Sequence, residues 1–295
     1  MTFQDTLKDN ALLTAHYLES CFSHNADVPE HLFKAMRYAV MNGGKRFRPF
    51  LVLESAKLFD VSQEQALPTA AALECIHSYS LVHDDLPAMD DDDLRRGQPT
   101  VHIAFDEATA ILAGDGLLTY AFEILGSVNT HPEASVRAEL VLELAKAAGW
   151  SGMAGGQALD LKAEGNGQMS LDDVAQIQSM KTGALIRFAC EAGAILGGAS
   201  MQERMALANY GDKLGRAFQI ADDLLDVEGD PDKVGKATAK DVTAGKATFV
   251  SLMGVTKAKE ELESLERQAT ESLSVFGERA SKLIEAASFA VKRNH

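Results

Sequence analysis

The sequence has few of the residues that interrupt helices or cross-link a chain. Proline occurs seven times in 295 residues and cysteine three times, at Cys21, Cys75 and Cys190. Cysteines so far apart match neither a zinc-binding spacing nor a disulfide framework, so we expect buried free thiols in a reducing cytoplasm. The scarcity of proline favours long helices over turns.

Basic residues are also in deficit. The chain has 28 lysines and arginines against 43 aspartates and glutamates, a formal net charge of −15. A chain this acidic is not expected to bind nucleic acid, because the phosphate backbone would be repelled. The same charge disfavours a diphosphate ligand unless metal ions intervene.

Long apolar runs are missing as well. No stretch approaches 18 uninterrupted apolar residues, so we expect no membrane-spanning helix. Residues 1–10 have no basic region followed by an apolar stretch, and we expect no secretory signal. These features predict a cytoplasmic protein.

Helical periodicity dominates, and no alternating strand pattern bounded by turn dipeptides is evident. The fold class expected is all-α, a single domain over 1–295, because no linker, repeat or composition shift divides the chain. We expect helices at 3–22, 31–42, 46–59, 65–86, 106–127, 134–163, 171–197, 202–228, 246–256, 258–275 and 278–292.

Two boundaries have a mechanism, and one helix stands out by its composition. Gly43 and Gly44 can end a helix in the left-handed conformation. Ser170 is an N-cap candidate followed by acidic residues. The helix at 65–86 is apolar nearly all round, so we expect it to be buried in the middle of a bundle.

That buried helix leads into an acidic motif. Residues 84–96 hold six carboxylates and two guanidiniums. On a continuous helix, Asp84 and Asp90 would diverge by about 120°. Pro87 disfavours helical geometry at the residue before it, so the helix should loosen and let Asp90 return beside Asp84. The alternative is a solvated acidic loop.

A second acidic motif lies downstream. Asp222 and Asp226 are four residues apart, on one helix face, whereas Asp223 points about 100° away. Like charges on one face repel, and a hard divalent cation relieves that repulsion. Mg²⁺ usually takes one or two protein carboxylates and fills its remaining positions with water and phosphate oxygens. We therefore expect the two motifs to face each other across a pocket, holding Mg²⁺ against a diphosphate.

Basic residues cluster at glycine-rich positions. Lys45 and Arg48 follow the glycine pair and could grip a phosphate, or form a solvated cap. Arg95 and Arg96 could bind diphosphate, or neutralise the acidic residues beside them. A histidine on an apolar helix is usually a core residue, but His77 lies seven residues, about two turns, before Asp84 and so faces the same way.

Further basic residues surround the second motif. Lys181 and Thr182 precede a glycine inside an expected helix, where the lysine could contact a substrate or simply extend its ammonium group to solvent. Two Gly-Lys pairs follow, which end at Lys236 and Lys246. They predict either a mobile basic lid or a flexible surface loop.

Together these motifs resemble the trans-isoprenyl diphosphate synthase family over about residues 30–250. The matching patterns are Asp-Asp-x₄-Asp followed by Arg-Arg, Gly-Gly-Lys-Arg-x-Arg-Pro, Gly-Gly-Gln157-x-x-Asp160-Leu, Lys-Thr-Gly, Phe218-Gln219, Asp-Asp-x-x-Asp and the Gly-Lys pairs. The nearest type resembles bacterial short-chain farnesyl diphosphate synthases. The chain departs from the family at Ala239 and at Phe249-Val250, in the lid.

The resemblance implies an isoprenoid synthase fold, an all-α bundle around a central active-site cavity, in a homodimer. It implies Mg²⁺-dependent prenyl transfer, in which isopentenyl diphosphate condenses with dimethylallyl and geranyl diphosphate by ionisation, condensation and elimination. The product would be C15 farnesyl diphosphate plus diphosphate, with C20 or C10 products as alternatives. A non-catalytic regulatory subunit of the same fold is an alternative of another class. A class I terpene cyclase would carry a different second motif, which we do not find.

The resemblance also implies roles for single residues. Three Mg²⁺ per active site would be held by Asp84, Asp90 and Asp222, with Asp85 and Asp226 close by. The diphosphate of isopentenyl diphosphate would be held by Lys45, Arg48, His77 and Arg96. The allylic diphosphate would be held by Arg95, Lys181, Lys236 and Lys246, with Thr182 and Gln219 beside the reacting carbons as further catalytic residues. Tyr79 and Ser80 would set product length.

Overall fold

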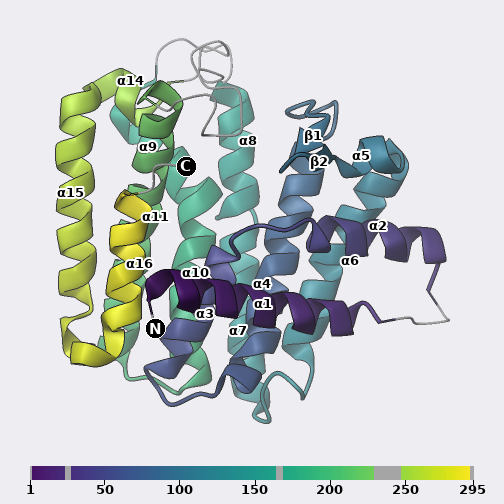
Figure 1. Ribbon diagram of the computed structural model, residues 1–295, viewed down its shortest axis with the longest axis horizontal. Helices are drawn as coiled ribbons and strands as arrows, with labels where there is room; N and C mark the ends of the chain where they lie inside the picture. Colours follow the sequence, from purple (N-terminus) through teal and green to yellow (C-terminus); the bar gives the residue numbers. More distant parts are fainter. Residues whose placement is uncertain (1, 24–27, 164–168, 229–246, 293–295) are drawn as a thin grey trace. The chain divides into compact units, whose positions relative to one another are not determined.

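The computed structural model describes residues 2–23, 28–163, 169–228 and 247–292. The chain divides into two compact units, Met1–Leu142 and Glu143–His295, each described here by itself. Both are built from helices (Figure 1), which confirms the all-α fold class.

The first unit is organised around one helix. Its helices are α1 (Phe3–Cys21), α2 (Glu30–Met41), α3 (Phe47–Lys57), α4 (Gln63–Asp84), α5 (Val101–Ala104), α6 (Glu107–Gly126) and the first part of α7 (Ala134–Ala148). A capping box between Ser62 and Gln65 begins α4, which packs against α1, α2, α3 and α6. As its apolar sequence predicts, α4 is buried on nearly all sides.

One helix of the first unit, α6, is long and apolar. By length and composition alone, α6 could cross a membrane, and 44% of its apolar window is buried within the protein. Core helices of soluble proteins satisfy the same criterion. Within the unit, α6 packs against α2, α4 and α5.

A short hairpin, which the sequence did not lead us to expect, follows the first acidic motif. β1 (Leu94–Arg95) and β2 (Gln98–Pro99) pair antiparallel, with Leu94 opposite Pro99. The two residues between them, Arg96 and Gly97, have φ of 54° and 75°. Positive φ at both central positions is the condition for a tight two-residue hairpin. Two-residue strands are too short to show the alternation of apolar and polar residues by which a strand is predicted from sequence.

The second unit is built around α11 (Met201–Glu228), which packs against α10, α14, α15 and α16. Its other elements are α8 (Met153–Ala163), α9 (Leu171–Gln178), a π-helical turn (Ser179–Gly183), α10 (Ala184–Leu196), α14 (Phe249–Met253), α15 (Val255–Ser272), a 3₁₀ segment (Ser274–Ala280) and α16 (Ser281–Val291). The described part of α11 ends immediately before Gly229.

Several expected boundaries were right and others wrong. Gly43 and Gly44 have φ of 73° and 107°, and Ser170 forms a capping box, as predicted. The expected helix at 134–163 is wrong, because the chain turns between α7 and α8 over 149–152. A Cβ on Gly152 would lie 2.1 Å from the carbonyl oxygen of Ala147, so only glycine fits there. Gly254, with φ of 82°, separates α14 from α15 three residues earlier than expected.

The cysteines are free, as expected. Cys75 and Cys190 are buried, whereas Cys21 is only half-buried. Burial raises the pKa of each of these thiols above its ordinary value.

Candidate active site

The chain folds back on itself directly after α4. The backbone N–H of Asp90 donates to the carbonyl of Asp84 at 2.8 Å, and that of Asp91 donates to Leu86 at 3.2 Å. The helix ends at Asp84, two residues earlier than expected, and the chain ahead of Pro87 turns back so that Asp90 returns to the level of Asp84, as the sequence predicted. Asp84 is half-buried and Asp90 is exposed.

Asp85 is held by Arg95. The Nε of Arg95 donates to Oδ1 of Asp85 at 2.6 Å, its Nη2 contacts the same oxygen, and Asp92 lies 3.8 Å from Nη2. Burial raises the pKa of the Asp85 carboxyl, although the hydrogen bond from Arg95 acts in the opposite direction. In this structure Arg95 therefore neutralises its acidic neighbours, which was one of its two expected roles.

Arg96 lies on the glycine turn between α2 and α3. Its Nη1 donates to the carbonyl of Gly43, and to that of Asn42 at 3.5 Å. A Cβ on Gly44 would lie 2.5 Å from Nη1 of Arg96. The backbone angle thus favours glycine at the second position of the turn, and a side chain there would displace the guanidinium of Arg96.

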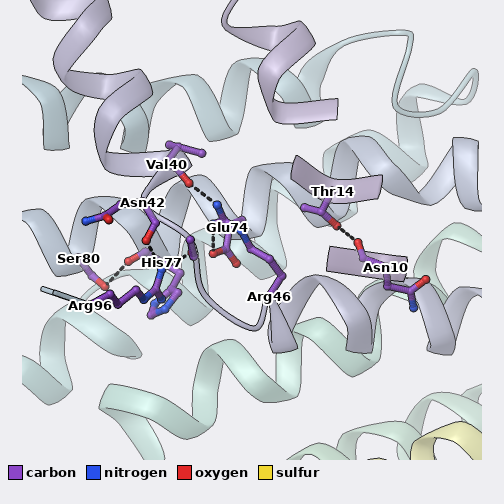
Figure 2. A network of polar contacts seen from close by, with 10 residues as sticks. Asn10, Thr14, Val40, Asn42, Arg46, Glu74, His77, Ser80 and Arg96 are labelled. Carbon is purple, nitrogen blue, oxygen red and sulfur yellow. Dashed lines mark hydrogen bonds and ion pairs between the residues drawn. The ribbon is translucent and has the colours of Figure 1, made fainter. Parts of the chain in front are cut away.

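Arg46, which the sequence did not single out, is the buried member of the basic run. Its Nη1 donates to Oε1 of Glu74 at 2.5 Å and its Nη2 to the carbonyl of Val40 (Figure 2). The side chains of Arg46 and Glu74 are 4% and 3% exposed. A glutamate in the middle of the apolar stretch of α4 was the available signal, since charged residues are rarely fully buried unless paired.

Arg48 joins Arg46 and Arg96 in a cationic cluster of the first unit, and His77 lies within the field of these charges. The Nε of Arg48 is buried and has no hydrogen-bond partner in the described part of the chain. Burial lowers the pKa of Arg48, which Glu74 counteracts and Arg96 reinforces. Burial, then the charges of Arg48, Arg96 and Arg46, lower the pKa of His77 well below its ordinary value, so its ring is neutral. Lys45 is exposed.

The residues expected to set product length lie on α4. Tyr79 is buried, and its ring meets that of His83 edge to face, with centroids 5.8 Å apart. Burial, helped by the charge of Asp84, raises the pKa of Tyr79 to about 12. The hydroxyl of Ser80 donates to the carbonyl of His77 at 2.9 Å.

In the second unit the π-helical turn carries Lys181 and Thr182. The Nζ of Lys181 donates to Oδ2 of Asp160 on α8 at 2.7 Å, and Nε2 of Gln219 on α11 donates to Oγ1 of Thr182 at 3.1 Å. A Cβ on Gly156 would lie 2.3 Å from the backbone nitrogen of Lys181. Close packing on this glycine and bonds to both flanking helices fix the turn. π-turns are frequent at functional sites.

Gln157, next to that glycine, has both amide atoms buried without a hydrogen-bond partner among the described residues. Buried polar groups are seldom left unpaired, so this amide needs an explanation. Gln157 and Asp160 belong to a motif that the sequence matched without assigning roles.

The second acidic motif divides by helix face. Asp223 is buried and accepts from the backbone N–H of Phe249 at 2.8 Å, at the start of α14. This structural role fits its predicted position away from Asp222 and Asp226. Asp222 is half-buried. The Oδ2 atom of Asp226 is buried and has no partner among the described residues.

Lys236, Lys246 and Ala239 lie outside the described residues. Of the family departures, Phe249 is buried at the base of α14, with Arg216 5.6 Å from its ring centroid, and Val250 is buried beside it. Within the described ranges, no group of three or more histidine, cysteine, aspartate or glutamate side chains is placed to hold a metal by itself.

Comparison with known proteins gives a consistent result. Residues 29–283 match the family model described as polyprenyl synthetase. The chain is 42% identical over 277 residues to a farnesyl diphosphate synthase of Bacillus subtilis, covering 94% of this chain and 93% of that one. It is also 42% identical over 267 residues to a geranylgeranyl diphosphate synthase of Cyanophora paradoxa, covering 90% of this chain and 89% of that one.

A solved structure agrees with these sequence relatives. The apo crystal structure of an FPP/GFPP synthase from Zymomonas mobilis is 44% identical, with a TM-score of 0.89 and 98% of both chains covered. A family match over most of the chain, relatives above 40% identity and a shared fold all lead to one conclusion: the chain belongs to the polyprenyl synthetase family.

Proposed function

We propose that the chain is a Mg²⁺-dependent prenyltransferase that joins isopentenyl diphosphate to an allylic diphosphate and makes farnesyl diphosphate. The observation that carries the proposal is the cationic cluster of Arg46, Arg48 and Arg96 around a neutral His77. Three guanidiniums gathered in one place repel one another, the carboxylate of Glu74 compensates only one of them, and a bound anion would relieve the repulsion that remains.

The first unit would hold the isopentenyl substrate. Arg48 has a buried donor without a described partner, and Arg96 presents a guanidinium at the glycine turn. Guanidinium forks suit diphosphate oxygens. The neutral ring of His77 can donate one N–H without adding charge, and Lys45 adds an exposed ammonium.

The second unit would hold the allylic diphosphate through Lys181, with Lys236 and Lys246 as further cations and Arg95 from the first unit. In this structure Lys181 is paired with Asp160. Substrate binding would therefore exchange one anionic partner for another. The same exchange would release Arg95 from Asp85.

The donor set fits Mg²⁺. Asp84 and Asp90 are drawn together by a backbone hydrogen bond of 2.8 Å, and Asp226, one turn after Asp222, has a buried oxygen without a described partner. These are hard carboxylate oxygens, with few per ion, as Mg²⁺ prefers. Asp84, Asp90 and Asp222 would hold the ions, three per site by the family resemblance. When bound, the ions stabilise the charge of the departing diphosphate.

The chemistry would follow from the charges of the chain. Lys181 stabilises negative charge on the leaving diphosphate as the allylic C–O bond breaks. The double bond of isopentenyl diphosphate attacks the allylic carbon, forming the new C–C bond. Thr182 and Gln219 present oxygen dipoles to the developing cation. The proton is then lost from the condensed product to the released diphosphate.

Product length would be set at Tyr79. It lies on the turn of α4 before Asp84, and a growing tail must pass along this helix away from the diphosphate. The buried aromatic ring of Tyr79, which packs against His83, would block further extension of the tail. We therefore propose a C15 product. The names of the relatives do not decide the point, because farnesyl and geranylgeranyl synthases are both among them.

We also propose a homodimer in the cytoplasm. The first unit exposes apolar side chains on α5, α6 and α7: Ile103, Ile111, Leu112 and Leu142 are 45% to 55% exposed. Apolar side chains so exposed on one unit favour a protein partner, and a second copy of the chain is the simplest one.

The test is an assay of the purified chain with Mg²⁺, isopentenyl diphosphate and dimethylallyl diphosphate, with products resolved by chain length. We expect mainly the C15 product, and no turnover when Mg²⁺ is chelated. A chain that binds both substrates without making product would favour the non-catalytic subunit. A mainly C20 product would overturn the role of Tyr79.

A further inference from the structure

The buried ion pair of Arg46 and Glu74 lies directly beneath the glycine turn. We propose that this pair is a positioning device, which fixes the turn and thereby Arg48 and Arg96, the two arginines that hold the diphosphate of isopentenyl diphosphate. The inference rests on the proposed function of that site and adds two residues that do not touch the substrate.

The first step concerns the backbone. Arg46 has φ of 49°, in the left-handed region, although it is not glycine. Such a conformation is disfavoured and persists where the surroundings hold it. The surroundings here are the carbonyl of Val40, near the end of α2, and the carboxylate of Glu74 on α4, both bound by the guanidinium of Arg46 (Figure 2). One side chain thus ties together α2, α4 and the start of α3.

The second step connects this tie to the diphosphate-binding arginines. Arg48 lies in the first turn of α3, two residues after Arg46. Arg96 comes from the hairpin and donates to the carbonyls of Asn42 and Gly43, in the segment that Arg46 closes. Neither guanidinium can keep its place if this segment moves.

The third step concerns charge. Glu74 favours the charged forms of Arg48 and Arg96, whereas burial opposes them. The hydrogen bond that Glu74 accepts comes from Arg46. Arg48 therefore gains a compensating charge and still keeps a buried donor without a described partner. The negative charge of Glu74 thus offsets part of the positive charge of the cluster, while the guanidiniums of Arg48 and Arg96 stay available to the substrate.

The experiment replaces both partners, Arg46→Met with Glu74→Leu, in the full chain. One positive and one negative charge are removed together, so the net charge of the cluster is unchanged. Replacing a buried ion pair by apolar residues of similar volume is often neutral for stability. We expect the dissociation constant for isopentenyl diphosphate, measured calorimetrically with Mg²⁺, to rise about ten- to a hundredfold. The Michaelis constant for that substrate should rise by more than kcat falls.

The control is a second ion pair in the same unit, whose glutamate is buried and whose lysine is 40% exposed. Glu54 on α3 is equally buried, accepts from Lys57 at 2.6 Å and from Asn10 at 2.8 Å, and contacts none of the arginines of the cluster by any described bond. The same replacement there, Lys57→Met with Glu54→Leu, should leave the affinity for isopentenyl diphosphate within about twofold. An equal loss in both double variants would overturn the inference, as would unchanged affinity in the Arg46 and Glu74 variant.

A second variant covers the case in which the double variant does not fold. Glu74→Gln removes a negative charge, so the field alone predicts tighter binding of an anion, whereas loss of positioning predicts weaker binding. Tighter binding would overturn the inference. Wild-type chain that binds isopentenyl diphosphate but makes no product overturns the proposed function, while the binding comparison still tests the pair. Wild-type chain that does not bind it overturns both.

Discussion

The glycine turn allows a prediction in which two neighbouring residues should behave differently. In Gly44→Ala, the new Cβ would lie 2.5 Å from Nη1 of Arg96 and 2.6 Å from its Cζ. The closest ordinary contact is 3.4 Å, so Nη1 must move by about 3.4 − 2.5 = 0.9 Å. Arg96 ends in a flexible side chain and can move, but it then leaves its place on the carbonyl of Gly43. The loss should therefore appear mainly in substrate affinity.

The size of that loss follows from the displacement. A misplacement of about 1 Å in a site can lower the rate by up to about 10²-fold. We expect the Michaelis constant for isopentenyl diphosphate to rise about ten- to a hundredfold, and that for the allylic substrate by much less. The backbone angle adds a stability loss of about 1–3 kcal/mol, because alanine is strained at φ of 107°.

Gly43→Ala is the control. Gly43 also has a positive φ, 73°, so alanine costs about 1–2 kcal/mol there, but its Cβ meets nothing within 4 Å. Thermal unfolding should show comparable losses in the two variants, and steady-state kinetics with each substrate varied should separate them. An equal rise of the isopentenyl Michaelis constant in both variants would refute the reasoning from Arg96.

Three further predictions concern other parts of the site. Asp84→Ala and Asp222→Ala should each lower turnover at saturating Mg²⁺ by about 10²–10³-fold with the fold retained by circular dichroism, and near-normal turnover would remove that residue from the metal site. Tyr79→Ala should shift products to C20 or longer by chromatography, while Tyr79→Phe keeps C15; an active alanine variant that still stops at C15 would show that another residue sets the length. Because the pKa of His77 is well below 6.5 in the folded chain, the unfolded chain takes up the proton first as pH falls through about 6.5, and stability is lost below that pH. The melting temperature of His77→Gln should fall less steeply than that of wild type below this pH, and parallel curves would contradict a neutral ring at His77.

The sequence predicted the course of the backbone correctly where a single local residue determines the backbone conformation. The chain leaves helical geometry ahead of Pro87 and brings Asp90 back to Asp84, and Ser170 caps α9. The hairpin at 94–99 and the π-helical turn were not predicted. The strands of the hairpin are too short to show an alternating pattern of apolar and polar residues. The π-turn depends on the close approach of Gly156 from α8, which is a tertiary contact.

The candidate site also has features that the sequence could predict and features that it could not. Residue types and spacing were enough to select Arg48, Arg96 and His77. They could not tell which basic side chain of the run is buried and paired, because Arg46 finds Glu74, 28 residues away, only in the folded chain. Pairing of Arg95 with the acidic residues beside it was one of two roles that the sequence left open. The pairing of Lys181 with Asp160 could not be predicted, because it joins residues of two helices that meet only in the folded chain.

The central claim is that the arginine cluster binds isopentenyl diphosphate and that the Lys181 turn binds the allylic diphosphate. Steady-state kinetics of Arg48→Ala and Lys181→Ala, with each substrate varied in turn, test it most directly. Arg48→Ala should raise mainly the Michaelis constant for isopentenyl diphosphate, because it removes the buried donor without a described partner. Lys181→Ala should raise mainly that for the allylic substrate. Equal effects of each substitution on both substrates would contradict this division.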